Sequence, residues 1–146
     1  MTRFLLDINV LIALIDPAHV QHDKAHAWFA TKGNKAWATC PITENGVLRI
    51  VGHPRYPNCP GSPAAVADLL VAFLELPGHI FWPDDVSLFD RERVDAARLL
   101  DSAHLTDSYL LALARARQGQ LATFDIRLVT DAVIQGNRAL HLISLS

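Results

Sequence analysis

The stretch that decides the fold runs from residue 104 to residue 125 and reads HLTDSYLLALARARQGQLATFD. Thr106 is a good helix N-cap, and the leucines and alanines after it recur at helical spacing. Gly119 is suited to ending that helix. Residues 121–124 read as a short buried strand, and Asp125 stands where this strand ends. The stretch is therefore predicted to be a helix followed by a strand.

Two carboxylates flank this helix and strand. Asp107 falls in the first turn of the helix, and Asp125 follows the strand directly. Open α/β sheets bind their ligands beyond the carboxyl ends of parallel strands. A helix that runs back along the sheet begins at that same edge. If the strand is parallel to its neighbours, both acids are expected there.

The N-terminus repeats this arrangement. Residues 4–6 predict a buried strand that Asp7 ends. Asn9 can then cap a helix whose apolar run covers residues 10–15. Later in the chain, a third acid also follows a predicted strand and lies near the start of a helix.

That third acid is Glu44. Residues 36–39 read as a strand, and Thr43 is a plausible N-cap for the helix that follows. Glu44 falls in the first turn of this helix, whose valines and leucine face inward. Three separate strand ends or helix starts thus each present an acid within apolar sequence.

The rest of the chain continues to alternate strands and helices. Its 146 residues are the length of one domain, with no internal repeat. Alternation of this kind predicts an α/β sandwich with a mostly parallel sheet and helices on both faces. The further elements expected are a helix at 19–33, ended by Gly33, with Val20, Ala27, Trp28 and Phe29 on its apolar face; a proline-rich loop at 53–63; a helix from Pro63 that buries Val66, Leu69, Leu70, Phe73 and Leu74; a strand at 79–82; helices at 91–100 and 127–133; and a strand at 140–145.

The chain resembles the PIN-domain ribonucleases, and specifically the VapC-type toxins of bacterial toxin–antitoxin pairs. The resemblance rests on FLLDINVLIAL, TENGVLRI, LTDSYLLALA and LATFD, in that order and at family-like separations, and it spans nearly the whole chain. It implies one PIN domain over residues 1–146, a three-layer sandwich. It also implies an RNA substrate, a cognate VapB-type antitoxin and a homodimer. Carried over by position, the acidic site is Asp7, Glu44, Asp107 and Asp125, and Thr123 matches the hydroxyl near the metal site.

Four acids suit the hydrolysis of a phosphodiester bond. Mg²⁺ or Mn²⁺ held by carboxylate oxygens can activate a water and neutralise charge on the phosphate. We expect Asp7 and Asp107 to be the principal metal ligands, and Asp125 to bind through water or to hold a second ion. Glu44 would orient or deprotonate the attacking water. Asn9 and Thr123 would support the site.

Composition limits the class of protein. The net charge of −2 and pI of about 6.4 give no global attraction to nucleic acid, although bound metal would reverse the sign locally. Cys40 and Cys59 have no CxxC spacing and read as thiols of a reducing compartment. No secretory signal and no membrane span is expected, which places the protein in the cytoplasm.

Simpler interpretations stand beside these. Each acid taken alone could serve only as a helix-start charge favoured by the helix dipole. His19, His22 and His26 read as a solvated or stacked helix face rather than a metal site, because no Glu base accompanies them. Arg49, Arg55 and Tyr56 are either RNA contacts, with Tyr56 stacking on a base, or loop surface.

Two other functions compete with the ribonuclease. One is a catalytically silent PIN-like protein that acts through a protein partner, against which the four intact acids count. The other is an aspartyl-phosphate phosphotransferase, which would need a second acid where Asn9 stands and a lysine late in the chain. The last lysine is Lys35, so this alternative is weak.

Overall fold

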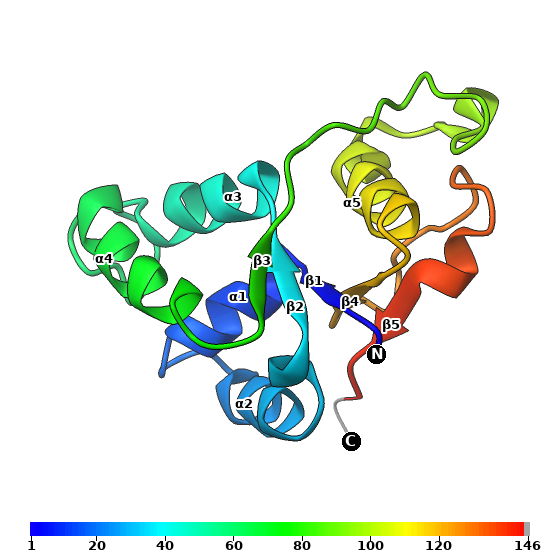
Figure 1. The fold of residues 1–146 in the computed structure, drawn as a ribbon. Helices are drawn as coiled ribbons and strands as arrows, with labels where there is room; N and C mark the ends of the chain where they lie inside the picture. Colours follow the sequence, from blue (N-terminus) through cyan, green and yellow to red (C-terminus); the bar gives the residue numbers. More distant parts are fainter. Residues whose placement is uncertain (145–146) are drawn as a thin grey trace.

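The computed structural model describes residues 1–144, whose strands form one sheet with helices on both faces (Figure 1). The strand order is β3-β2-β1-β4-β5, and every neighbouring pair is parallel. The predicted α/β three-layer sandwich is confirmed. The strands are β1 (Phe4–Leu6), β2 (Trp37–Thr39), β3 (His79–Phe81), β4 (Gln120–Thr123) and β5 (Leu140–Leu142).

The helices divide unequally between the two faces of the sheet. Four of them cover one face: α1 (Ile8–Ile15), α2 (His22–Thr31), α3 (Pro41–Val51) and α4 (Pro63–Leu74). The other face carries α5 (Leu105–Ala116). Short 3-10 turns complete the described chain: η1 (Gly33–Lys35), η2 (Ala96–Arg98), η3 (Ser102–His104) and η4 (Gly136–Ala139).

The strands alternate between the two cores that these layers enclose. Phe4, Leu6 and Trp37 are buried on the side of α1 to α4. Leu5 and Leu121 are fully buried on the side of α5. Because the side chains of a strand point to opposite faces in turn, residues that follow Leu5 and Leu121 by two positions also face α5. These residues are Asp7 and Thr123.

Three helices begin earlier than predicted. Asp7 rather than Asn9 is the N-cap of α1, with the Ile8 N–H donating to Asp7 Oδ1 at 2.8 Å. Cys40 precedes α3, since Pro41 suits the first helical position, and the Thr43 hydroxyl instead accepts a bond from the Cys40 N–H at 3.0 Å. Thr106 is the second residue of α5, which continues directly from η3.

The end of α5 also differs from its prediction. The helix stops at Ala116, and Gln118, with φ of 59°, rather than Gly119 takes the left-handed conformation that commonly follows a helix. Gly119 is needed for a different reason. A Cβ there would lie 2.5 Å from the carbonyl oxygen of Arg3, the residue before β1, so this close approach requires a glycine.

Two predicted helices, at 91–100 and 127–133, are wrong. These segments pair with each other instead, through an antiparallel bridge between Val94 and Val133. The Asp95 N–H donates to the Ala132 carbonyl at 2.8 Å, and the Ile134 N–H donates to the Arg93 carbonyl at 2.9 Å. Only η2 remains of the first helix, because main-chain bonds to a distant segment replace the helical ones.

Some expected core positions and boundaries are also wrong. The second helix covers only 22–31, so Val20 lies before it and is 94% exposed, and Ala27 is exposed as well. Gly33 opens η1 rather than ending α2. On α4, which does begin at Pro63, Leu69 is 50% exposed. The last strand ends at Leu142, and residue 145 lies outside the described residues. Among residues 1–144, no helix is both long and apolar enough to span a bilayer.

Candidate active site

Neighbouring ends of β1 and β4 create the centre of the site. Leu6 pairs with Ala122, so the residues that follow, Asp7 and Thr123, lie next to each other. The Thr123 hydroxyl donates to Asp7 Oδ2 at 2.7 Å, and both side chains are buried. Parallel pairing thus joins an acid and a hydroxyl that are 116 positions apart in the sequence.

Thr123 holds two further groups in place. Its hydroxyl oxygen accepts a bond from the Asp125 N–H at 3.1 Å and from Asn9 Nδ2 at 3.3 Å. The Asn9 Oδ1 atom is buried and has no hydrogen-bond partner within residues 1–144. An unpaired buried oxygen is costly unless something polar meets it. Asn9, expected as a supporting residue, therefore presents a free oxygen beside Asp7.

Asp107 reaches this edge from the α5 layer. Burial raises the pKa of Asp107 to about 6, and the charges of Asp7 and Asp125 add to the rise, while His104 opposes it. Burial also raises the pKa of Asp7, and Asp125 adds to this rise, although the bonds from Thr123 and the Ile8 N–H act against it. The three aspartates therefore lie close enough together for their charges to oppose the ionisation of Asp7 and Asp107.

Glu44 occupies a neighbouring position. It lies in the first turn of α3, as predicted, and its Oε2 accepts a bond of 2.6 Å from the Thr39 hydroxyl. Thr39 ends β2, which pairs with β1, so Glu44 lies one strand away from Asp7. The structure brings three aspartates together, whereas Glu44 bonds to a threonine. Neither Thr39 nor its other partner, His79, was predicted from the sequence to belong to the site.

The donor set fits a hard divalent cation. Within the described residues, no three Asp, Glu, His or Cys side chains are close enough together to enclose one ion. Mg²⁺ does not require such a cage, since it keeps several waters and takes one or two carboxylates. Asp7, Asp107 and the free Asn9 Oδ1 supply oxygen ligands of the kind that Mg²⁺ and Mn²⁺ prefer.

Comparison with known proteins identifies the family. Residues 4–131 match the family model described as the PIN domain. The chain belongs to the PIN domain family. The resemblance to VapC-type proteins is confirmed by two relatives from Mycobacterium tuberculosis. Ribonuclease VapC44 is 43% identical over 143 residues, which cover 98% of this chain and 99% of the relative. Ribonuclease VapC39 is 42% identical over 128 residues, which cover 88% and 92%.

Solved structures share the fold of this PIN domain at low sequence identity. Mycobacterium tuberculosis VapC20, described as a sarcin-ricin loop cleaving toxin, matches with a TM-score of 0.59 and 13% identity over 90% of this chain and 97% of the other. VapBC2 from Rickettsia felis, bound to a DNA fragment from its promoter, matches with a TM-score of 0.61 and 13% identity over 98% and 100%. Both likenesses extend over nearly the whole PIN domain.

The three candidate RNA-contact residues lie outside the aspartate cluster. Arg49 and Arg55 are exposed. Tyr56 is partly buried, and its hydroxyl donates to Asp16, which follows the last residue of α1. Asp7 caps the opposite end of this eight-residue helix, roughly 12 Å away along its axis. Contact of these residues with RNA stays a prediction.

The histidines at the start of α2 have a structural role in this PIN domain. His22 Nδ1 and His26 Nε2 each lie 2.7 Å from a main-chain oxygen, those of Ala13 and Leu14. Their rings are 4.4 Å apart. They satisfy carbonyls at the C-terminal end of α1, which agrees with the stacked helix face expected from the sequence.

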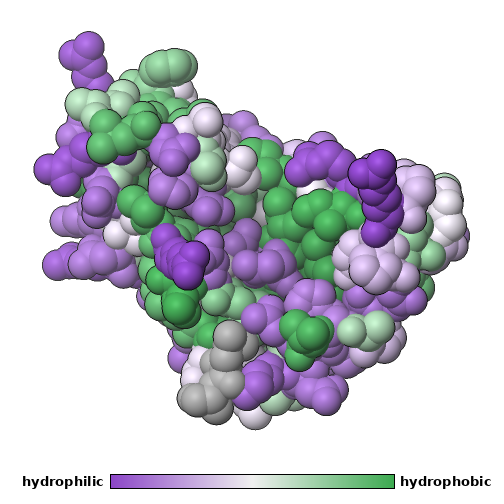
Figure 2. All heavy atoms as spheres, turned by 180° about the vertical axis from the view of Figure 1, so that it is seen from behind, coloured by the Kyte–Doolittle hydropathy of each residue, from purple (hydrophilic) through white to green (hydrophobic). Residues whose placement is uncertain are grey.

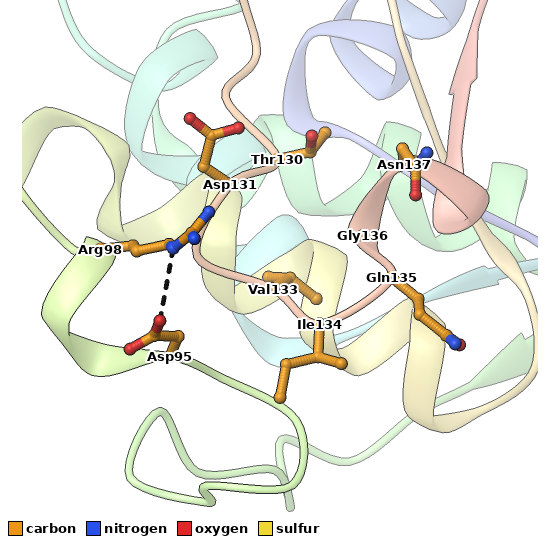
Figure 3. A pocket seen from close by; sticks show the side chains of 9 residues that line it. All are labelled: Asp95, Arg98, Thr130, Asp131, Val133, Ile134, Gln135, Gly136 and Asn137. Carbon is orange, nitrogen blue, oxygen red and sulfur yellow. Dashed lines mark ion pairs between the residues drawn. The ribbon is translucent and has the colours of Figure 1, made fainter.

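A hollow of about 460 Å³ lies elsewhere, between η2 and the turn before η4 (Figure 3). None of the four predicted acids lines it. Its one arginine, Arg98, is paired with Asp95 at 3.3 Å, and Asp131 adds a second negative charge. The hollow is therefore separate from the aspartate cluster, and its arginine is already paired with an acid.

Proposed function

We propose that this PIN domain is a metal-dependent endoribonuclease of the VapC toxin type, which hydrolyses RNA phosphodiester bonds and is neutralised by a cognate VapB-type antitoxin. The observation that carries the proposal is the convergence of three aspartates at the strand ends, where the Thr123 hydroxyl joins Asp7 to the Asp125 N–H and Asp107 faces both acids. It occurs in a chain that is 43% identical to a protein named as a ribonuclease.

Each residue has a distinct task in the proposed mechanism. Asp7 and Asp107 would hold Mg²⁺ or Mn²⁺, and Asp125 would bind through water or hold a second ion. The ion supplies charge neutralisation at the phosphate and lowers the pKa of a bound water. Thr123 fixes the Asp7 carboxylate by its 2.7 Å bond. Glu44 would orient the attacking water or take its proton.

The raised pKa of Asp107 bears on this mechanism. With a pKa of about 6, this carboxyl is partly protonated in weakly acidic solution. A carboxyl group must lose its proton to bind a metal, so cation and proton compete for the site. Metal binding is therefore proposed to strengthen as the pH rises from 5 toward 7.

The proposed substrate class depends on access to the RNA backbone, and the proposed partners depend on apolar side chains at the protein surface. Single-stranded or loop RNA exposes its backbone and bases, which is the reason to prefer it over a regular helix. Apolar side chains are exposed at the surface, among them Val71 of α4 and Phe81 of β3, and an antitoxin or a second copy of the chain could bind there. Figure 2 shows several such apolar groups between hydrophilic ones on the face opposite to that of Figure 1. The two free thiols agree with a cytoplasmic location.

Cleavage of a mixed cellular RNA pool tests the proposal. The purified protein should cut at a few discrete sites with Mg²⁺ or Mn²⁺, and not with chelator. Asp107→Asn should abolish these cuts. Asp101→Asn is the matched control, because Asp101 is exposed just before η3 and asparagine can keep its bond from the Ala103 N–H. Equal behaviour of wild type and Asp107→Asn would favour the silent binding protein instead.

A further inference from the structure

Glu44 belongs to a chain of hydrogen bonds that reaches the edge strand of the sheet. The Thr39 hydroxyl oxygen lies 2.6 Å from Glu44 Oε2 and 2.7 Å from His79 Nε2. Thr39 is fully buried between the two, and a main-chain group of Leu74 hydrogen-bonds the His79 ring. The path therefore runs from the end of α4 through His79 and Thr39 to Glu44.

A count of protons shows that this chain cannot be complete in its ordinary charge state. The Leu74 bond favours the protonated ring, so the group at Leu74 is its carbonyl, which only accepts and therefore takes the Nδ1 proton of His79. Thr39 has one hydroxyl proton, yet it has an acceptor on each side. With neutral His79 and ionised Glu44, the two links at Thr39 share that one proton, and one of them must open.

We propose that His79 is a positioning residue for Glu44, because its ring competes with the Glu44 carboxylate for the single hydroxyl proton of Thr39. A neutral ring competes for this proton, and whenever the ring accepts it the carboxylate is free to act at the sheet edge. A protonated ring donates to the Thr39 oxygen, so that Thr39 donates to Glu44 and holds it. The inference rests on the proposed function, in which Glu44 acts on water.

The surroundings of His79 keep its ring neutral at ordinary pH. Burial lowers the pKa of His79, and the charge of Arg3 lowers it further, while the Leu74 bond acts against both. Arg3 is fixed near the ring, since its guanidinium donates to the Trp37 carbonyl at 3.0 Å and also to the Gly78 carbonyl. Trp37 packs on the ring at 4.6 Å and carries no charge. Within residues 1–144, Arg3 is the charged group that acts on the His79 ring directly, and Glu44 is linked to the ring through the Thr39 hydroxyl.

Titration of the histidines by NMR tests the hydrogen-bonded chain without any nuclease assay. In Glu44→Gln, the pKa of His79 should fall by about half a pH unit or more, because a charge two hydrogen bonds away from the ring is removed. His141 is the internal control, because it is a half-buried histidine on the opposite edge strand and bonds to Trp28. A His79 titration that is unchanged in Glu44→Gln would overturn the inference.

Kinetics test the competition for the hydroxyl proton. In His79→Phe, Thr39 can donate only to Glu44. At pH values above the pKa of His79, kcat of this variant should therefore be about three- to tenfold lower than that of wild type. At pH values below that pKa, the two kcat values should be equal. The matched control His141→Phe should follow wild type at every pH. Adding Thr39→Val to His79→Phe removes the hydroxyl that holds Glu44 and should restore kcat, which a merely structural defect would not allow.

The two experiments separate the inference from the proposed function. If the His79 pKa falls in Glu44→Gln but no variant cleaves RNA, the chain of bonds stands and the proposed function fails. If RNA is cleaved and the double variant is no faster than His79→Phe, the function stands and the competition at Thr39 is refuted.

Discussion

The Thr123 hydroxyl donates to Asp7 Oδ2 at 2.7 Å and joins the ends of β4 and β1 at the centre of the site. The same oxygen accepts bonds from Asn9 Nδ2 and the Asp125 N–H. One fully buried hydroxyl therefore aligns three residues of the site. Burial raises the pKa of Asp7, whereas the bonds from Thr123 and the Ile8 N–H favour the charged form of this carboxylate.

Thr123→Val should destabilise the fold and weaken the site. Valine has a similar shape but leaves the buried Asp7 carboxylate without its side-chain donor, which costs about 1 to 3 kcal/mol of unfolding free energy. Urea unfolding in the presence of chelator measures the loss. Thr31→Val is the control, because the exposed Thr31 hydroxyl bonds only to its own helix, and it should change stability by less than about 0.5 kcal/mol. Equal losses in both variants would contradict the assigned role of Thr123.

Stability should depend on pH through Asp107. Its pKa is about 6 in the folded protein against 3.8 for an ordinary aspartate. Between these values the folded state binds more protons than the unfolded state, so this group's contribution falls as the pH rises through the window. Without metal, Asp107→Asn should be more stable than wild type at pH 7, by about 1 to 2 kcal/mol after allowance for solvent screening of a half-exposed group.

Urea unfolding at pH 4 and pH 7 checks this sign. The advantage of Asp107→Asn should vanish at pH 4, where both forms of residue 107 are uncharged in the folded state. Asp101→Asn, a change of the same charge at an exposed site, should keep a nearly constant difference from wild type. A constant difference for Asp107→Asn as well would mean that the aspartates do not interact.

Much of this site could be predicted from sequence, because it depends on local patterns. The buried run at residues 4–6 is bounded by Asp7, and β1 has these limits. Acids that follow buried parallel strands must meet at one edge, which is why Asp7 and Asp125 came together as expected. The spacing of the apolar residues in α5 predicted that Asp107 lies in the first turn of this helix.

What the sequence did not predict depends on residues far apart in the chain. Val94 and Val133 pair across the molecule and replace two expected helices. Gly119 is required by the carbonyl of Arg3, not by a helix end. Glu44 bonds to Thr39 and, through it, to His79, 40 positions further along. Each of these contacts is created by the packing of the sheet, and no local pattern encodes it.

Mg²⁺ and Mn²⁺ should stabilise the folded protein. The aspartates converge only in the native state, so a cation that binds there shifts unfolding by mass action, by about 2.7 kcal/mol at a concentration one hundred times its Kd. For a chain of this size each kcal/mol raises Tm by about 2 to 4 °C. A thermal scan at pH 7 with added Mg²⁺ should show this rise, and chelator should remove it. Asp107→Asn should lose most of the rise, whereas Asp101→Asn should keep it; indifference of the wild-type Tm to millimolar metal would count against the site.

Tyr56→Phe should lower stability through a bond at the far end of α1. Burial alone would raise the pKa of Asp16, but bonds from Tyr56, Asn58 and the Ala18 N–H together lower it below its usual value. An acid with a lowered pKa adds stability above its unfolded pKa and loses it as the pH falls. Tyr56→Phe should therefore cost about 1 to 3 kcal/mol at pH 7 and less at pH 3.

The same variant separates structure from catalysis. RNA cleavage per folded molecule should be unchanged in Tyr56→Phe, since the lost hydroxyl serves Asp16, and phenylalanine keeps the ring that could stack on a base. Unfolding of Tyr56→Phe, Asp16→Ala and the double variant should show strong non-additivity, because all three lack the bond between the Tyr56 hydroxyl and Asp16. Additive losses would show that Tyr56 and Asp16 act independently, and that the end of α1 is held by other contacts.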